Sequence, residues 1–253
     1  MISKRVIPFL LHDKNGLVKT KQFRDPVYIG DPLNAIRIFN AKHVDELVLL
    51  DIGRSRDRKM PDFDFVSRVV SECFMPLGYG GGIRNVSDAK NIFSLGVEKV
   101  ILQTSVLQDT SIIREISQLA GSQSVSISID VIGDNPSTYK VFHSARQKVL
   151  HMNLIDLLKM VQSEGAGEVI LTSIQREGTF GGYDLDLISY VREIIDIPLV
   201  INGGAGSIED FNRASLAGVD ATAAGSMFVF YKNRDGVLLN YSHSTNSIIE
   251  VGT

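Results

Sequence analysis

The strongest constraint on the fold is a repeat that relates the two halves of the chain. Six residues of the first half recur 122 positions later with the same identity: Glu46, Pro76, Gly81, Gly82, Gly96 and Val97 match Glu168, Pro198, Gly203, Gly204, Gly218 and Val219. Strands of one fold can resemble one another by chance, but chance does not hold glycines and prolines at one constant offset. The repeat therefore predicts a structure built from two equivalent halves.

Short apolar runs alternate along the chain with longer stretches of helical periodicity. The runs cover residues 5–11, 46–52, 75–83, 98–104, 124–130, 167–174, 197–203 and 221–226. Strands that alternate with helices predict parallel βαβ units, and eight such units favour a closed barrel. With no linker in sight, the sequence predicts one α/β domain over residues 1–253, a (β/α)8 TIM barrel with an internal two-fold half-barrel repeat.

Two helix starts can be read directly from the sequence. Asp31 followed by Pro32 predicts an N-cap with proline at the first helical position. Ser87 before DAKNIFSLG predicts a second cap, for a helix that ends near Gly96.

Charge and cysteine content exclude several classes of function. A net charge of -3 and a pI near 6.0 give no general attraction for nucleic acid, so any anion must be bound locally. Cys73 is the only cysteine and cannot form an internal disulfide. The start of the chain, MISKRVIPFLL, has too short an apolar stretch for a signal peptide or a membrane span. We expect a cytoplasmic protein with neither a nucleic acid nor a membrane as partner.

Two glycine-rich loops follow the third and seventh predicted strands. They read GYGGGIRN (78–85) and INGGAGSI (201–208), and each leads into a helix. Glycines let backbone N–H groups approach an anion, and the helix start adds a positive dipole end. Thr104 and Ser226 follow as hydroxyl donors at the same offset of 122. The loops predict two phosphate sites for a ligand with a phosphate at each end; the alternative is a pair of plain βα turns.

Strand parity places several polar side chains inside the predicted barrel. If Asp130 points inward, Ser126 and Ser128 do too, where bulky branched residues are usual. The same parity puts four charged residues in one layer at the barrel bottom, where they could neutralise each other: Arg5, Glu46, Lys99 and Glu168. Features at the bottom of such barrels usually concern stability, so a structural role for this layer remains open beside a functional one.

Asp130 is the candidate catalytic residue. It ends the fifth predicted strand at the top of the barrel, where catalytic groups collect, and is a candidate general acid or base. A cap for the following loop is the alternative. His12 and His143 are expected in top-side loops, but no cluster of His, Cys or carboxylates has the spacing of metal ligands. We expect no metal and no cofactor.

At these residues the chain resembles HisF, the cyclase subunit of imidazole glycerol phosphate synthase. The motifs span nearly the whole chain and include KRVIPFL, DELVLLDI, GYGGGI, GSQSVSISID, GAGEVILTSIQREGT and NGGAGSIEDF. The resemblance implies ammonia delivery through the barrel from a HisH glutaminase docked at the bottom, with Arg5, Glu46, Lys99 and Glu168 around the tunnel entrance. It implies Asp130 as the second catalytic aspartate. It also implies two phosphate sites, Gly82 with Gln103 and Thr104, and Gly178 with Gly204, Gly225 and Ser226.

Several positions depart from the HisF pattern. Leu11 stands where the family has its first catalytic aspartate, and a leucine cannot transfer a proton; Asp13, two residues into the loop, is the nearest substitute. The family sequence DRDGT is here QREGT, with Gln175 and Glu177, and residues 144–151 replace a Ser-Gly-Lys-Lys type loop. The sequence after Phe230 lacks the long amphipathic helix expected to close a HisF barrel.

These departures are similar to the WbuZ type of HisF-like proteins, which are associated with glycosyl amidation. That resemblance implies an ammonia-channelling subunit that works with a HisH-like glutaminase and a sugar N-amidotransferase, which makes acetamidino sugars for surface polysaccharides. A true cyclase of histidine biosynthesis is the first alternative. A non-catalytic barrel that binds a phosphorylated ligand is the second.

Overall fold

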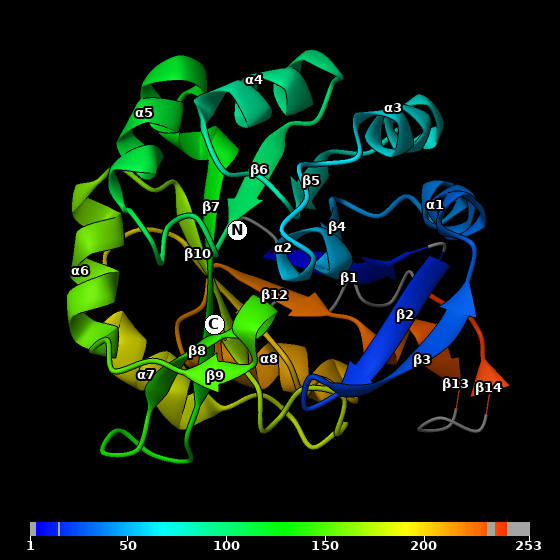
Figure 1. Cartoon of the computed structure of the whole chain (residues 1–253). Coiled ribbons are helices and arrows are strands. Elements are labelled where there is room, and N and C mark those ends of the chain that lie inside the picture. Colours follow the sequence, from blue (N-terminus) through cyan, green and yellow to red (C-terminus); the bar gives the residue numbers. More distant parts are fainter. Residues whose placement is uncertain (1–3, 15, 232–235, 242–253) are drawn as a thin grey trace.

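The computed structural model describes residues 4–14, 16–231 and 236–241, and within them eight parallel strands close into a barrel (Figure 1). Neighbours along the chain pair in order, and β7 pairs with β10 to join the two halves. The barrel strands are β1 (Arg5–Asp13), β4 (Leu47–Asp51), β5 (Leu77–Gly80), β6 (Lys99–Leu102), β7 (Val125–Ile132), β10 (Glu168–Ser173), β11 (Leu199–Asn202) and β12 (Ala221–Ala224). The predicted TIM barrel is confirmed.

Helices surround the strands (Figure 1), so the barrel strands are covered on both sides and read as continuous apolar runs. The helices are α1 (Pro32–Ala41), α2 (Ile52–Arg56), α3 (Phe63–Glu72), α4 (Val86–Ser94), α5 (Ser111–Ala120), α6 (Leu154–Ser163), α7 (Leu185–Arg192), α8 (Ile208–Leu216) and α9 (Ser226–Val229), with 3-10 turns η1 (Ser122–Ser124) and η2 (Ser144–Arg146).

One predicted helix start is confirmed and one is wrong. Asp31 caps α1 by accepting from the N–H of Asn34, with Pro32 at the first helical position. For α4 the cap is Asn85, which accepts from the N–H of Asp88. Ser87 lies inside the first turn, because the asparagine two residues earlier already satisfies a free N–H of the helix start.

Each half carries an antiparallel hairpin on its first strand, which the sequence analysis missed. The first hairpin consists of β2 (Gly16–Lys21) and β3 (Arg24–Gly30), and β2 pairs with the end of β1. The second consists of β8 (Lys140–His143) and β9 (Lys148–Val149), and β8 pairs with the end of β7. Both hairpins extend strands beyond the barrel at its top, so they can reach over its mouth. Their equivalent placement agrees with the two-fold repeat.

The apolar core is divided into an outer layer and a small inner cluster. The outer layer lies between strands and helices and includes Val125, Ile127 and Ile129, as the parity of β7 predicts. The inner cluster fills the barrel with side chains from six strands: Ile7, Phe9, Val48, Ile101, Ile170, Val200, Ala221 and Ala223. Glu168 pairs in register with Ser126, and Thr172 with Asp130, so polar residues lie below and above this cluster.

Gly78 on β5 does not leave an open space in the barrel. A Cβ at this position would lie 3.2 Å from Val48 and 3.3 Å from Ile101. These two side chains lie where a larger residue would extend into the barrel.

The described end of the chain packs against the barrel without a long helix. After α9, β13 (Phe230–Tyr231) pairs with β14 (Gly236–Val237), and Tyr241 is fully buried. The Tyr241 ring lies 5.2 Å from that of Phe228, and its hydroxyl donates to the carbonyl of Val6 at 3.3 Å. The sequence analysis expects no long helix after Phe230; the last part of that segment, residues 242–253, lies outside the described residues.

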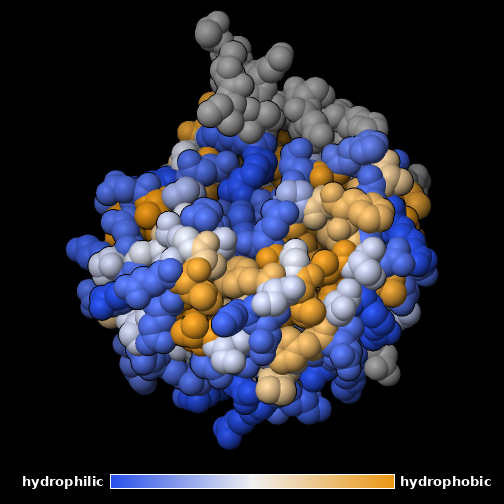
Figure 2. All heavy atoms as spheres, turned by 90° about the horizontal axis from the view of Figure 1, so that it is seen from above, coloured by the Kyte–Doolittle hydropathy of each residue, from blue (hydrophilic) through white to orange (hydrophobic). Residues whose placement is uncertain are grey.

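The surface contains exposed apolar residues as well as charged ones. Figure 2 shows one face where hydrophobic residues gather between hydrophilic ones. Over the described chain, the most exposed large hydrophobic side chains are Phe74 (85%), Leu216 (71%) and Tyr28 (65%). Phe74 precedes β5 and Leu216 precedes β12, so both lie toward the bottom of the barrel. None of the described helices is long and apolar enough to cross a membrane.

Candidate functional site

Four charged side chains form a closed ring at the bottom of the barrel. Arg5 donates to Glu46 at 2.5 Å and to Glu168 at 2.8 Å. Lys99 contacts the other oxygen of each carboxylate, at 2.9 Å for Glu46 and 3.2 Å for Glu168. The structure thus brings the predicted layer together, and we call these four residues the charged ring.

The charged ring is buried on its acidic side and open on its basic side. Glu46 and Glu168 are 4% and 6% exposed, whereas the side chains of Arg5 and Lys99 are 33% and 20% exposed. Burial acts to raise the pKa of Glu168, but Lys99, Arg5 and the hydroxyl of Ser126, which donates at 2.7 Å, outweigh it. The pKa of Glu168 therefore lies below its ordinary value, and the carboxylate stays charged at neutral pH.

A cavity of about 450 Å³ opens at the top of the barrel. The ends of the strands, α2, both hairpins and the loop after β10 contribute to its wall. All seven residues predicted to bind phosphate line this one cavity: Gly82, Gln103, Thr104, Gly178, Gly204, Gly225 and Ser226. We call the first three the first anion cradle and the last four the second anion cradle.

Asp130 lies in this cavity and is 4% exposed. One of its oxygens accepts from Gln103 at 2.5 Å and from the hydroxyl of Ser144 on the second hairpin. Burial raises the pKa of Asp130 to about 6, although the hydrogen bonds from Ser144, Gln103 and Thr172 oppose the shift. A carboxyl group with a pKa near neutrality can both donate and accept a proton, which suits a general acid or base.

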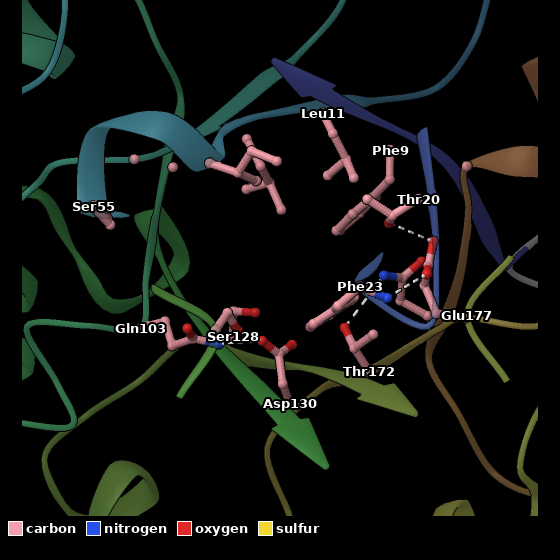
Figure 3. A pocket seen from close by; sticks show the side chains of 18 of the residues that line it. Phe9, Leu11, Thr20, Phe23, Ser55, Gln103, Ser128, Asp130, Thr172 and Glu177 are labelled. Atoms are coloured by element: carbon pink, nitrogen blue, oxygen red, sulfur yellow. Dashed lines mark hydrogen bonds between the residues drawn. The ribbon is translucent and has the colours of Figure 1, made fainter. Parts of the chain in front are cut away.

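Leu11 faces Asp130 across the cavity (Figure 3), so the position opposite Asp130 carries no carboxylate. Asp13, the nearest substitute in sequence, accepts two hydrogen bonds of 2.9 Å from Arg56. These bonds hold the pKa of Asp13 below its ordinary value. Asp13 is therefore a poor proton donor at neutral pH, and the expectation that it could substitute is not supported by the geometry.

Positive φ angles explain why both cradles require glycine. Gly82 has φ +75°, and a Cβ there would lie 2.6 Å from the carbonyl of Lys59. Gly204, its repeat equivalent, has φ +115°, and a Cβ there would overlap the carbonyl of Gly182. Only glycine adopts these angles without strain. The two cradles differ in one donor, because the N–H of Gly82 already donates to the hydroxyl of Ser55 at 3.2 Å.

Glu177 holds the first hairpin over the cavity through hydrogen bonds (Figure 3). Its carboxylate accepts from the hydroxyl of Thr20 at 3.1 Å and from the N–H of Phe23 at 3.1 Å. The backbone N–H of Gln22 donates to the Glu177 carbonyl at 3.0 Å. Glu177, one of the positions that depart from the family sequence, therefore forms a buried contact between the loop after β10 and the hairpin.

The two histidines expected in loops lie in strands. His12 is in β1, pairs with Asp51 at 3.2 Å and stacks on Phe65. His143 is in β8 and is 2% exposed. β1 runs longer than its apolar run, and β8 belongs to a hairpin that the sequence analysis missed, which is why both positions were misjudged. No group of three His, Cys or carboxylates among the described residues could hold a metal ion.

Three residues of the site were missed or left without a role by the sequence analysis: Lys19, Ser144 and Glu177. The first two lie on the hairpins, whose short strands surrounded by charged residues do not stand out from loops. The Asn-Gly pair at 15–16, followed by a short run with the β-branched residues Val18 and Thr20, is the signal that could have revealed β2.

Fold and site together define a (β/α)8 barrel with a half-barrel repeat, a charged ring at its bottom and a glycine-lined cavity at its top. The chain belongs to the family described as "Histidine biosynthesis protein", whose sequence profile matches residues 5–234.

Individual relatives are similar along nearly their full length. A protein of Pseudomonas aeruginosa named "Putative imidazole glycerol phosphate synthase subunit hisF2" is 44% identical over 245 residues, which are 95% of this chain and 96% of the relative. A Leptospira borgpetersenii protein named "Putative imidazole glycerol phosphate synthase subunit HisF" is 44% identical over 97% of this chain and 98% of its own length. The HisF subunit of Alkaliphilus metalliredigens is 37% identical over 90% and 91%. The similarity to the HisF family is confirmed.

Proposed function

We propose that this protein conducts ammonia from a HisH-like glutaminase through the barrel to a sugar N-amidotransferase. The observation that carries the proposal is the combination of the charged ring at the bottom with a top cavity that has Leu11 opposite Asp130. The ring provides an entrance lined by fixed charges. The leucine removes one of two proton-transfer groups that ring closure by a cyclase would use.

Two serines on the inward face of β7, beside the inner apolar cluster, support a path for a small neutral molecule. Ser126 lies at the ring and Ser128 lines the cavity above it, on the same face of β7. Two hydroxyls on one inward face are unusual for a barrel that otherwise packs aliphatic groups. They offer hydrogen bonds to ammonia, which would pass as the uncharged species because an ammonium ion would have to leave water to enter the apolar interior.

Exposed apolar side chains near the bottom support the docking of a partner there. Phe74 and Leu216 are largely exposed and precede strands, at the end of the barrel where Arg5 is open to solvent. Exposed apolar side chains of this size gain free energy when a partner covers them and removes them from water. A glutaminase seated on this face would release ammonia directly over the charged ring.

A true cyclase subunit of histidine biosynthesis is the second candidate, favoured by two anion cradles in one cavity and by the pKa of Asp130. The names of the similar proteins describe such subunits. A non-catalytic barrel that binds a phosphorylated ligand would need the cradles alone. For each of these three candidate functions we propose that residues 1–253 form one domain of a cytoplasmic protein. We propose neither a cofactor nor a metal for any of them.

The test reconstitutes the barrel with a HisH-like glutaminase and the sugar amidotransferase, and measures product formation from glutamine and from ammonium salt. We expect Lys99→Met combined with Glu168→Gln to lower the glutamine-dependent rate and to spare the ammonium-dependent rate. Equal loss of both rates, or no complex with a glutaminase, would refute conduction. Cyclase turnover of about 1–10³ s⁻¹ with ammonium salt would favour the second candidate.

A further inference from the structure

Two segments that are rich in basic residues border one side of the mouth of the top cavity. The first includes α2 and reads IGRSRDRK (52–59), and the second includes η2 and reads SARQK (144–148). They are far apart in the chain, but η2, the turn that leads into β9, packs against α2 (Figure 1). Ile52 and Ser55 of α2 and Ala145 of η2 line the cavity. The two segments therefore form one continuous part of the cavity's rim.

Four cations on these segments lack a counter-charge. Arg58 and Lys59 follow α2, Arg146 ends η2 and Lys148 begins β9, and all four residues are exposed. None of them forms an ion pair with a residue that the structure describes. We call these four residues the basic rim.

The carboxylates nearest to the basic rim already pair with other arginines. Asp13 and Asp57 both accept from Arg56, and Asp62 pairs with Arg54. The positive charge of the basic rim is therefore left in excess on this side of the mouth, although the whole chain has a net charge of -3. Like charges held side by side repel one another, and an acidic surface that covered them would relieve this repulsion.

The chemistry of ammonia requires that the mouth be covered when ammonia leaves it. Ammonia, like the amine of lysine, is mostly protonated in neutral water, and the ammonium ion has no free electron pair with which to attack a substrate. The enzyme that consumes the ammonia must therefore receive it before it reaches bulk water. Such an enzyme has to sit on the mouth, and one side of the mouth is the basic rim.

We propose that the basic rim is the docking surface for an acidic face of the sugar N-amidotransferase, which thereby covers the top cavity. This inference rests on the proposed function, because that function supplies the enzyme that consumes the ammonia. Met60 and Val149, which directly follow the basic rim in sequence, are 48% and 42% exposed and add apolar area to the contact. An anionic membrane would match the same charges, but its hydrated headgroups would leave the ammonia in contact with water.

The experiment measures binding of the full chain to the immobilised amidotransferase by biolayer interferometry, at about 0.05 M and about 0.5 M NaCl. Complementary charges steer two proteins toward each other, so the association rate constant should fall about tenfold at the higher salt concentration. Two charge-reversal pairs test the basic rim, Arg58→Glu with Lys59→Glu and Arg146→Glu with Lys148→Glu. Each pair should lower the association rate constant about tenfold at low salt and much less at high salt.

A matched control separates the basic rim from the net charge of the protein. Lys90→Glu with Lys159→Glu reverses two exposed cations on the outer helices α4 and α6 and changes the net charge by the same amount. This pair should leave the association rate constant close to that of the unmodified protein. Binding of the HisH-like glutaminase at the bottom should be unchanged in all three double variants, which shows that they fold.

Three results would overturn the inference. If both rim variants bind the amidotransferase like the control, the basic rim is not the docking surface, while glutamine-dependent product would still support the proposed function. If the chain binds vesicles of phosphatidylglycerol through the basic rim and does not bind the amidotransferase, the partner is a lipid surface. If neither amidotransferase binding nor glutamine-dependent product is found, the proposed function fails and the inference fails with it.

Discussion

Replacing Asp130 by asparagine should make the folded protein more stable at neutral pH. Burial raises the pKa of Asp130 from 3.8 to about 6, a shift of about two units. Since one unit corresponds to about 1.4 kcal/mol, ionising this carboxyl costs the folded state about 3 kcal/mol above pH 6. Asparagine keeps an oxygen that accepts from Gln103 and Ser144 but carries no charge. We expect Asp130→Asn to raise the free energy of unfolding by about 2–3 kcal/mol at pH 8.

The pH dependence gives the sign of the effect. Because the pKa of Asp130 is higher in the folded state, the folded protein holds the proton more tightly between pH 4 and pH 6. The free energy of unfolding should therefore fall as pH rises through this window and then stay level. In Asp130→Asn this fall should be absent, so the difference between the two proteins should grow from near zero at pH 4 to its full value above pH 6.

Urea unfolding followed by circular dichroism, at pH 4 to 8, measures this difference. Asp134→Asn, which removes the same charge at an exposed position after β7, serves as the control and should change stability by less than about 0.5 kcal/mol. The reasoning is refuted if Asp130→Asn is less stable than the unmodified protein at pH 8, or if the difference does not vary with pH. Either result would mean that the carboxylate is better solvated than its burial implies.

Three further predictions concern the ring, the missing aspartate and the hairpin. Lys99→Met should destabilise the fold by about 3 kcal/mol in urea unfolding, and adding Glu168→Gln should recover most of this loss by restoring a neutral ring. Cyclase turnover with ammonium salt should be about 10²–10⁴-fold below that of ordinary cyclases because of Leu11, and Asp13→Asn should not lower it further. Glu177→Gln should weaken the hairpin contact by about 1 kcal/mol, seen as faster amide exchange in residues 16–30, with no change in residues 140–149.

The inward layers of the barrel could be predicted from the sequence because a strand has a strict period of two. Once Asp130 was placed inward, the same parity placed Ser126 and Ser128, and the charged ring followed from the strand starts. Parity gave no information on residues outside the barrel strands. His143 was misplaced because it lies in a hairpin strand, and His12 because β1 runs beyond its apolar run. Both hairpins were missed, since strands of two to seven residues that contain charged side chains do not differ from loops in composition.

The sequence by itself determined the barrel, its two-fold repeat, the two glycine cradles and the loss of an acid at Leu11, because periodicity, turn chemistry and residue identity are local properties. Only the tertiary structure decided how these parts act on one another. It held Asp13 against Arg56, buried Asp130 beside Ser144, and brought the amine of Lys19 to the carbonyl of Phe9. Charge compensation depends on the distance between charged groups and on their burial. For residues far apart in the chain, both are set only when the barrel closes.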